Sequence, residues 1–430
     1  MSETTATVVI GGGAGGLAAA IAWRARGARV TLIEAGPSVG GKIGVTSLPG
    51  PAADGSATVA ADTGPSVLTL PYVLDRVFRL AGTTLEAELR LLRPDPFFRY
   101  AWPDGVVLDV YHALDDTRAE VARRLGTRAR DEFDRFLGDA RRIWRAVKDT
   151  FVEGPAPSIG RILKLGPLRA LWLLSQIDSL RSMWAGITRR VREPHLRDLL
   201  ARYATYNGSD VYQAPATLNC IAWVELGEGA SGVAGGMGQI RAALRRVAER
   251  IGVDVRLGCR ATRIRTAAGR VVGVDAATEP FDADHVVVNA DVGSLQALLG
   301  PDVPLPLPKA SRSIEISTSG WNALAKASVT PTFDDGRPAP HAVFFPAAYE
   351  DEFRDLFDRG RPPADPTIYL CDQQAAHERV GWADGSRPLF LMANAPAEPA
   401  DGSASPPSWW ADLAALVADR ARQVGWLGET

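Results

Sequence analysis

The chain has 430 residues and carries 48 Lys and Arg against 50 Asp and Glu, a formal net charge of −2. This balance provides no cationic surface for a phosphate backbone, so a nucleic-acid partner is not expected. Three separated cysteines without a CxxC pair, and five scattered histidines, argue against a metal site and a disulfide scaffold. The length exceeds one ordinary core and predicts two domains or one large discontinuous domain.

The N-terminus and the hydropathy of the chain bear on its location. The first apolar run begins within a few residues of the N-terminus, without a basic and then apolar leader, which predicts a cytoplasmic protein. No apolar run reaches the length of a spanning helix, so any membrane contact is expected to be peripheral.

The first segment with a definite pattern predicts a βαβ unit. A β-branched apolar run at 7–10 is followed by six residues rich in Gly at 11–16. A helical stretch at 17–23 then leads to a second strand at 29–33, which ends at Glu34. The order of strand, glycine turn, helix, strand and acid is typical of a dinucleotide site.

Each part of this unit has a physical task. Gly11 permits a tight turn, Gly13 lets the backbone approach a pyrophosphate, and Gly16 lets the helix lie close to the strand. The N–H groups at the helix N-terminus bind the phosphates, and Glu34 accepts ribose hydroxyls while repelling a 2′-phosphate. FAD or NAD is therefore favoured over NADP. The predicted contacts are Gly11, Gly13, Ala14, Gly15, Gly16, Glu34 and Ala35.

Three further glycine-containing segments are candidates for ligand contact. Gly40, Gly41 and Lys42 combine close backbone approach with a cation and predict a second layer of phosphate contacts, although an ordinary loop explains them equally well. The turn at 235–238 begins a helix and allows close approach of a planar or anionic ligand. Residues 289–291 follow a predicted strand at 285–288, where ligands of α/β proteins bind.

Between these segments lies a middle region with two possible interpretations. Aromatic residues at 97–102 and a strand at 106–110 predict a hairpin whose rings line a cavity or, more commonly, form core. Residues 113–210 are helical and basic, and 159–191 interleaves tryptophans and leucines with cations. That pattern suits a helix in the interface of an anionic bilayer, but a helical lid with a solvated basic face is slightly favoured by the residues alone.

The remaining strands divide the chain into domains. Strands at 253–257, 261–265, 271–274 and 285–288 resume the nucleotide domain, and strands at 315–329, 342–345, 367–371 and 388–394 form a second sheet before a helix at 409–424. The predicted fold class is α/β, with a discontinuous Rossmann-like domain at 1–70 and 231–300. A second, α+β domain is predicted at 71–230 and 301–396, followed by a tail at 397–430.

Taken together, these segments resemble the bacterial carotenoid desaturases of the flavin amine-oxidase superfamily. The middle segments most resemble the branch that acts on 1-hydroxycarotenoids as 3,4-desaturases. The resemblance rests on the glycine turn at 11–16 and on the segments 40–42, 62–66, 202–206, 235–237 and 289–291.

The resemblance implies tightly held FAD, a carotenoid substrate, and a helical membrane-facing lid around 113–210 that attaches to the inner face of the cell membrane. Because no second glycine fingerprint for a nicotinamide occurs, FAD is the expected hydride acceptor, reoxidised by oxygen, a quinone or another acceptor. Further flavin contacts are expected at Gly64, Pro65, Ser66, Ala261, Asn289, Ala290 and Asp291. Gly235, Gly236 and Met237 are expected to line the substrate site.

The chemistry needs few side chains, and the catalytic residues stay unassigned. Candidates for proton removal, or for binding a substrate hydroxyl, are Tyr203, Thr205 and Tyr206. Members of the family close with a second flavin-binding segment that residues 397–430 do not resemble, so a truncated, non-catalytic remnant is an alternative. A flavin oxidase that acts on amines is another.

Overall fold

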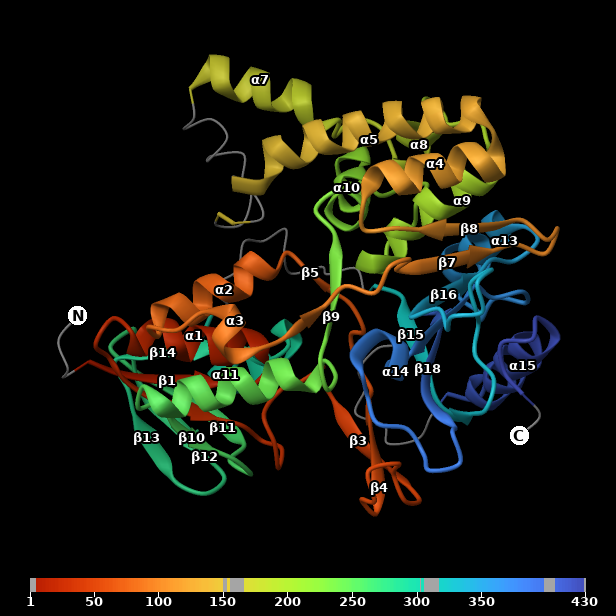
Figure 1. Ribbon diagram of the computed structural model, residues 1–430. Coiled ribbons are helices and arrows are strands. Elements are labelled where there is room, and N and C mark those ends of the chain that lie inside the picture. The colour runs from red at the N-terminus through yellow and green to blue at the C-terminus, as the bar shows by residue number, and fades with distance from the viewer. Residues whose placement is uncertain are drawn as a thin grey trace.

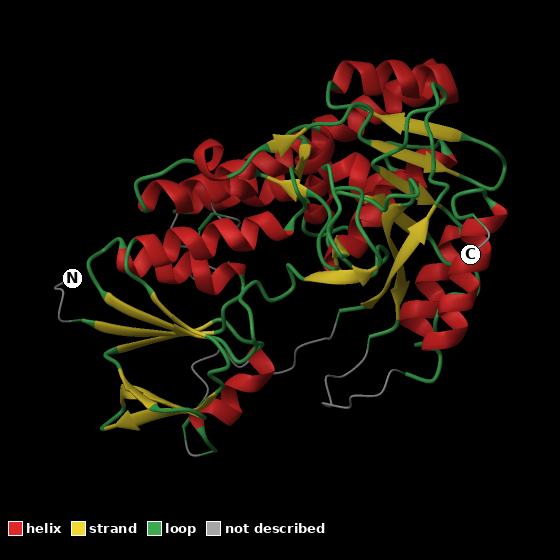
Figure 2. Cartoon of the chain, turned by 60° about the horizontal axis from the view of Figure 1, so that its bottom comes forward, coloured by secondary structure: helices red, strands yellow, loops and turns green. Residues whose placement is uncertain are grey.

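The computed structural model describes residues 5–149, 153–154, 166–301, 303–304, 317–397 and 407–428. Two sheets organise this part of the chain, one near the N-terminus and one near the C-terminus (Figures 1 and 2). A three-stranded sheet joins them, with β9 (Ala230–Val233) between β5 (Leu68–Thr69) and β6 (Leu91–Leu92).

The N-terminal sheet is parallel and has the strand order β10-β2-β1-β14. Its strands are β1 (Ala6–Ile10), β2 (Arg29–Ile33), β10 (Asp254–Arg256) and β14 (His285–Val288). Successive residues of β1 point to opposite faces: Val9 packs with helices α1 (Ala14–Arg24) and α11 (Gly238–Arg250), whereas Val8 packs against an antiparallel sheet. That sheet consists of β11 (Ala261–Ala267), β12 (Arg270–Ala276) and β13 (Pro280–Asp282).

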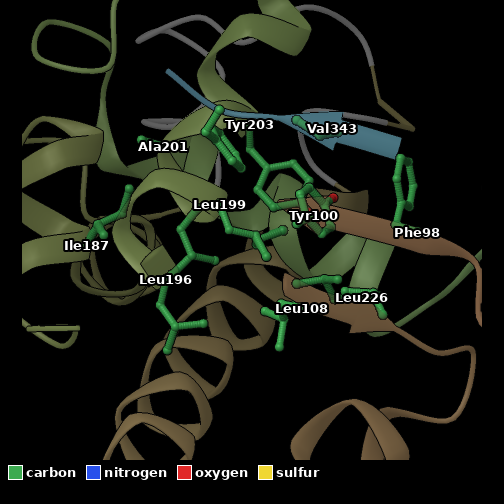
Figure 3. Packing of buried hydrophobic residues seen from close by; sticks show 14 of the residues in the cluster. Phe98, Tyr100, Leu108, Ile187, Leu196, Leu199, Ala201, Tyr203, Leu226 and Val343 are labelled. Carbon is green, nitrogen blue, oxygen red and sulfur yellow. The ribbon is translucent and has the colours of Figure 1, made fainter. Parts of the chain in front are cut away.

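The second sheet has six strands in the order β15-β18-β17-β16-β7-β8. Its strands are β7 (Phe98–Ala101), β8 (Val107–Val110), β15 (Ser319–Ala327), β16 (His341–Phe344), β17 (Ile368–Asp372) and β18 (Arg387–Ala395). The predicted hairpin, β7 and β8, joins the C-terminal strands because β7 pairs in parallel with β16. One face packs on the helices of the middle region, where Tyr100, Tyr203 and Leu226 meet in a buried cluster (Figure 3).

The helices of the middle region lie together at the top of Figure 1. They are α4 (Leu114–Leu125), α5 (Thr127–Val147), α7 (Pro167–Ile177), α8 (Met183–Thr188), α9 (Pro194–Ala201), η2 (Arg202–Asn207), η3 (Ala216–Asn219) and α10 (Cys220–Leu226). Part of the basic stretch predicted at 159–191 lies outside the described residues. None of the described helices is long and apolar enough to cross a membrane.

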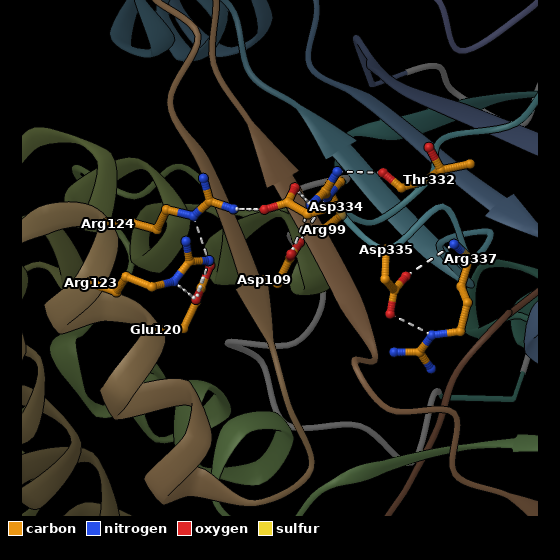
Figure 4. A network of polar contacts seen from close by, with 9 residues as sticks. All are labelled: Arg99, Asp109, Glu120, Arg123, Arg124, Thr332, Asp334, Asp335 and Arg337. Carbon is orange, nitrogen blue, oxygen red and sulfur yellow. Dashed lines mark hydrogen bonds and ion pairs between the residues drawn. The ribbon is translucent and has the colours of Figure 1, made fainter.

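A buried arginine ties the hairpin to the loop that precedes β16 (Figure 4). The Arg99 guanidinium donates to both carboxylate oxygens of Asp109 at 2.8 Å and to Asp334 at 2.7 Å. Arg124 from α4 contacts Asp334 as well as Glu120. Because Asp109 is almost fully buried, its charge depends on Arg99 for compensation, whereas the buried Arg99 also has the more exposed Asp334 as a partner.

Several elements differ from the sequence-based prediction. The antiparallel pair β3 (Val45–Pro49) and β4 (Thr58–Asp62) was not expected, because β3 has no clear alternation of apolar and polar residues. The helix predicted at 409–424 is confirmed as α15 (Trp410–Gln423), and this part of the predicted tail packs on the second sheet through Leu413 and Val417. The predicted strands of both large sheets are confirmed.

The short helical elements complete the described fold. They are α2 (Pro71–Leu80), α3 (Leu85–Glu88), η4 (Val292–Ser294), α12 (Leu295–Leu299), α13 (Tyr349–Phe353), η6 (Arg354–Asp358) and α14 (Gln373–His377). In α2, Pro71 occupies the first turn, where its missing N–H costs no helical hydrogen bond.

Candidate functional site

The glycine turn lies at the carboxyl end of β1 and has the geometry of an anion site. Gly11 has φ +95°, and a Cβ on Gly16 would lie 1.9 Å from the carbonyl oxygen of Gly11. Helix α1 begins with no side-chain cap and no acidic residue in its first turn. Since Gly15 is exposed, the first amides of α1 are accessible to a phosphate.

Glu34 follows β2 directly and lies beside this turn. Its Oε2 accepts a hydrogen bond from the Gly12 amide at 2.7 Å, and its Oε1 accepts one from the Gly36 amide at 2.8 Å. The carboxylate is half-buried and Ala35 next to it is exposed, so the acid is held at the rim of the turn. This is the position that a ribose-binding carboxylate requires.

The loop at 40–42 packs directly on the glycine turn. Gly40 forms a β-bridge with Gly13, and a Cβ on Gly41 would lie 3.2 Å from the Cα of Gly13. A Cβ on Gly64 would lie 1.9 Å from the Lys42 carbonyl oxygen. Three glycine-bearing segments far apart in the sequence therefore meet at one place, with the Lys42 side chain exposed beside them.

Asn289 closes the same edge of the sheet. Its backbone N–H donates to the Ile10 carbonyl at 2.8 Å, and its side-chain Oδ1 lies 2.6 Å from the position that a Cβ on Gly15 would occupy. The next two residues, Ala290 and Asp291, are exposed. Ala261, at the start of β11, is half-buried in the cluster behind β1.

The turn at Gly235, Gly236 and Met237 is not brought to the cavities described below. The N-terminus of α11 already has an anion, because the Asp62 carboxylate accepts the Met237 amide at 2.9 Å and pairs with Arg379 at 2.6 Å. Met237 packs in the core under α1. Gly236 makes room for this arginine, because a Cβ there would lie 2.2 Å from Arg379 Nε.

An apolar cavity of about 360 Å³ lies between the second sheet and α10. The predicted flavin residues Gly64, Pro65 and Ser66 line it, and so do Phe98 and Phe390 of the sheet. A hydroxyl chain fixes this wall, since the Ser66 hydroxyl contacts the Tyr369 hydroxyl, which lies 2.8 Å from His341 Nδ1. Burial holds the pKa of His341 well below 6.5, so that imidazole is neutral.

One polar cluster interrupts the apolar lining. Arg202 Nη1 donates to the Tyr206 hydroxyl at 2.9 Å, and that hydroxyl donates to Glu225 at 2.6 Å. The Tyr203 hydroxyl donates to the other oxygen of Glu225 at 2.9 Å. Burial raises the pKa of both tyrosines well above 10, so both hydroxyls stay protonated donors.

The candidate catalytic residues are thus separated by the fold. Tyr203 is fully buried and does not line the apolar cavity, whereas Tyr206 does. Thr205 lines a second, smaller cavity of about 200 Å³. Sequence reasoning did not select Arg202 or Glu225, although Glu225 is the one acid in the otherwise uncharged helix α10, which is a usable signal.

These residues fit FAD. The diphosphate suits the uncapped N-terminus of α1 and the glycine positions where a Cβ would clash. The ribose suits the Glu34 carboxylate at the rim of the turn. The cavity at Gly64–Ser66 provides an apolar space next to those loops. No group of three potential His, Cys, Asp or Glu metal ligands occurs in the part of the chain that the structure describes.

Comparison with known proteins agrees with this geometry. Residues 14–330 match the family model described as flavin containing amine oxidoreductase. The chain belongs to this family of flavoproteins, and FAD is its cofactor.

The similar curated proteins include hydroxyneurosporene desaturases and 4,4'-diaponeurosporene oxygenases. The hydroxyneurosporene desaturase of Rubrivivax gelatinosus is 34% identical over all of this chain and 80% of its own length. The hydroxyneurosporene desaturase of Rhodobacter capsulatus is 35% identical over 87% of this chain and 73% of its own length.

A solved structure supports the fold alone. An oxidoreductase from Methanosarcina mazei superposes with a TM-score of 0.60 at 16% identity, over 98% of this chain and 84% of that one. The predicted α/β class with a Rossmann-like domain is confirmed. The membrane-facing lid stays a prediction.

Proposed function

We propose that the protein is an FAD-dependent desaturase of an acyclic carotenoid that carries a hydroxyl at C1. The observation that carries this proposal is the apolar cavity beside Gly64, Pro65 and Ser66, which suits a hydrocarbon chain. The relatives named hydroxyneurosporene desaturase support the choice of substrate.

The residues of the cavity act by position. Desaturation moves a hydride from an allylic carbon and a proton from its neighbour, and bound FAD supplies the hydride acceptor. Phe98, Phe390 and Met392 line the cavity together with the Gly64–Ser66 loop, where they would hold the polyene and exclude water. Tyr206 is the cavity-lining hydroxyl among the candidates for handling the proton.

A spectroscopic assay tests this function. The purified protein, loaded with FAD and supplied with a 1-hydroxylated acyclic carotenoid, should shift the polyene absorption band to longer wavelength as conjugation grows. An unshifted band, together with reduction of the flavin by an amine, would favour an amine oxidase. A protein that cannot be loaded with FAD would favour the non-catalytic remnant.

We also propose that α7 rests on the membrane surface. Two large apolar side chains of α7 are exposed, Leu168 at 83% and Trp172 at 59%, and Leu180 just beyond the helix is 99% exposed. Such side chains are favourable in a lipid interface, and the helix stands at the outer edge of the helical region in Figure 1. A polyene could then enter the protein from the bilayer.

Vesicle binding tests this attachment. Replacing Leu168 and Trp172 by Ser should reduce co-sedimentation with anionic lipid vesicles several-fold. The matched control is Val380→Ser, because Val380 is also an exposed apolar residue, at 42%, but lies in the loop after α14. Equal loss in both proteins would contradict a role for α7.

A further inference from the structure

The apolar cavity shares a wall with the smaller cavity of about 200 Å³. Arg202, Tyr206, Tyr369 and Met392 line both spaces. Tyr206 is 43% exposed although it lies within the fold, because it faces these cavities. The apolar cavity beside the Gly64–Ser66 loop therefore adjoins the smaller cavity, with Arg202 and Tyr206 between them.

The smaller cavity differs in its chemistry. Its remaining lining includes Thr205, Thr367 and Asn394, each with a side chain able to form hydrogen bonds. Glu352 orients two of them, since it accepts from the Thr367 hydroxyl at 2.6 Å and from Asn394 Nδ2 at 2.8 Å. A hydrocarbon chain needs none of these groups.

Several hydrogen-bonding positions in this polar cavity remain available. Thr205 donates its hydroxyl to the Arg202 carbonyl at 2.8 Å, which leaves its oxygen as an acceptor. Asn394 uses its Nδ2 on Glu352, which leaves its Oδ1 as an acceptor. Arg202 donates through Nη1, and its Nε and Nη2 donate to none of the residues that the structure describes. The cavity thus offers both donors and acceptors, as one alcohol group requires.

The buried charge of Arg202 is only partly compensated by the residues around it. Its guanidinium carbon lies 5.0 to 5.8 Å from the ring centroids of Phe98, Tyr100, Tyr206 and Tyr369. The residue is buried, and the buried carboxylate Glu225 reaches it only through the Tyr206 hydroxyl rather than by direct contact. Burial of a cation without a directly contacting carboxylate is unfavourable, although Glu225 and the aromatic faces offset part of the cost. A neutral, apolar residue would suit a purely hydrocarbon substrate better.

The arrangement also agrees with the length of the substrate end. In a 1-hydroxylated chain that reacts at C3 and C4, the oxygen is separated from C3 by three bonds, roughly 3–4 Å. A group that binds this oxygen must therefore lie close to the flavin. Arg202 and Tyr206 meet this condition, because they line the same cavity as Gly64, Pro65 and Ser66.

We infer that Arg202, Tyr206, Thr205 and Asn394 form a subsite for an oxygenated chain end and make the enzyme selective for hydroxylated over hydrocarbon polyenes. This inference rests on the proposed function. A polyene without the hydroxyl leaves the donors and acceptors of the subsite unpaired, which penalises its transition state. Selectivity arises from that penalty, while the apolar cavity binds either chain.

The test compares two substrates that differ only in the hydroxyl. For the FAD-loaded protein, kcat/KM is measured with a 1-hydroxylated acyclic carotenoid and with its parent hydrocarbon. Thr205→Val keeps the shape of the side chain and removes its oxygen, and Arg202→Met removes the guanidinium. Each variant should lower the ratio of kcat/KM for the hydroxylated substrate to kcat/KM for the hydrocarbon about 10- to 100-fold.

The control and the contrary outcomes are distinct. Thr58→Val, on the exposed side of β4, should keep both values and therefore the wild-type ratio. If Thr205→Val keeps that ratio, or lowers both values equally, the subsite is wrong even where Arg202→Met fails to fold. Wild-type protein that oxidises both substrates equally well overturns the subsite alone. Wild-type protein that oxidises neither overturns the proposed function as well.

Discussion

The glycine turn allows a sharp prediction at Gly16. A Cβ at this position would lie 1.9 Å from the Gly11 carbonyl oxygen, whereas Cβ atoms in proteins essentially never approach another heavy atom closer than 3.0 Å. Since the clashing atom belongs to the backbone, the clash cannot be relieved by rotation of a side chain. Gly16→Ala must therefore push α1 from the end of β1 by about 1.1 Å or more.

The magnitude follows from two opposing effects. Overpacking of this kind costs about 1–3 kcal/mol, and the higher helix propensity of Ala returns about 0.5–1 kcal/mol. The net loss in the free energy of unfolding should be about 1–2 kcal/mol. Displaced amides also lose one or two hydrogen bonds to the diphosphate, which should weaken FAD binding about 10- to 100-fold.

Denaturant unfolding and FAD titration check both values. Gly138→Ala is the matched control, because Gly138 is also helical, in α5, and a Cβ there meets nothing within 4 Å. That variant should be more stable by about 0.5–1 kcal/mol and bind FAD normally. A Gly16→Ala protein with wild-type affinity for FAD would refute the assignment of this turn to the diphosphate.

Three further predictions concern charge. Asp109→Ala should lower the free energy of unfolding by about 3 kcal/mol, because the buried Arg99 then keeps only the largely exposed Asp334 as a carboxylate partner. The exposed Asp335→Ala should change it by less than about 0.5 kcal/mol, and equal losses in urea would contradict this reasoning. Hydrogen bonding to Glu193, and to a lesser extent to Asp104, raises the pKa of His195 from 6.5 to about 9. The stability that protonated His195 contributes to the fold is therefore complete below pH 6.5 and is lost as the pH rises through 9. His195→Gln should flatten the fall in stability across that window, and an unchanged pH profile would show that His195 is not responsible. Glu34→Ala should weaken FAD binding by about 1–3 kcal/mol in a titration, and unchanged affinity would mean that the acid does not hold the ribose.

Local patterns in the sequence predicted the parallel sheet well. The run from β1 through the glycine turn to Glu34 is contiguous, and each glycine has a nearby steric reason in the structure. The helix from Pro71 to Leu80 was likewise predictable because proline suits its first position.

The cavities could not be predicted in this way. Ser66, Arg202, Glu225 and Tyr369 line the apolar cavity from four distant segments. Phe98 of β7 joins Tyr369 of β17 at this cavity because both strands pair with β16, and that pairing has no local signature in the sequence. The motif that contains Tyr203 and Tyr206 was recognised, but only the fold shows that one is buried and the other faces the cavity.

The most direct test of the central claim is a single-turnover experiment without oxygen. FAD-loaded protein is mixed with an equimolar 1-hydroxylated acyclic carotenoid, and the flavin and polyene absorbances are followed together. The account predicts that the oxidised flavin band disappears at the rate at which the polyene band shifts to longer wavelength, with one flavin reduced for each double bond formed. A flavin that stays oxidised while the carotenoid is bound would contradict it.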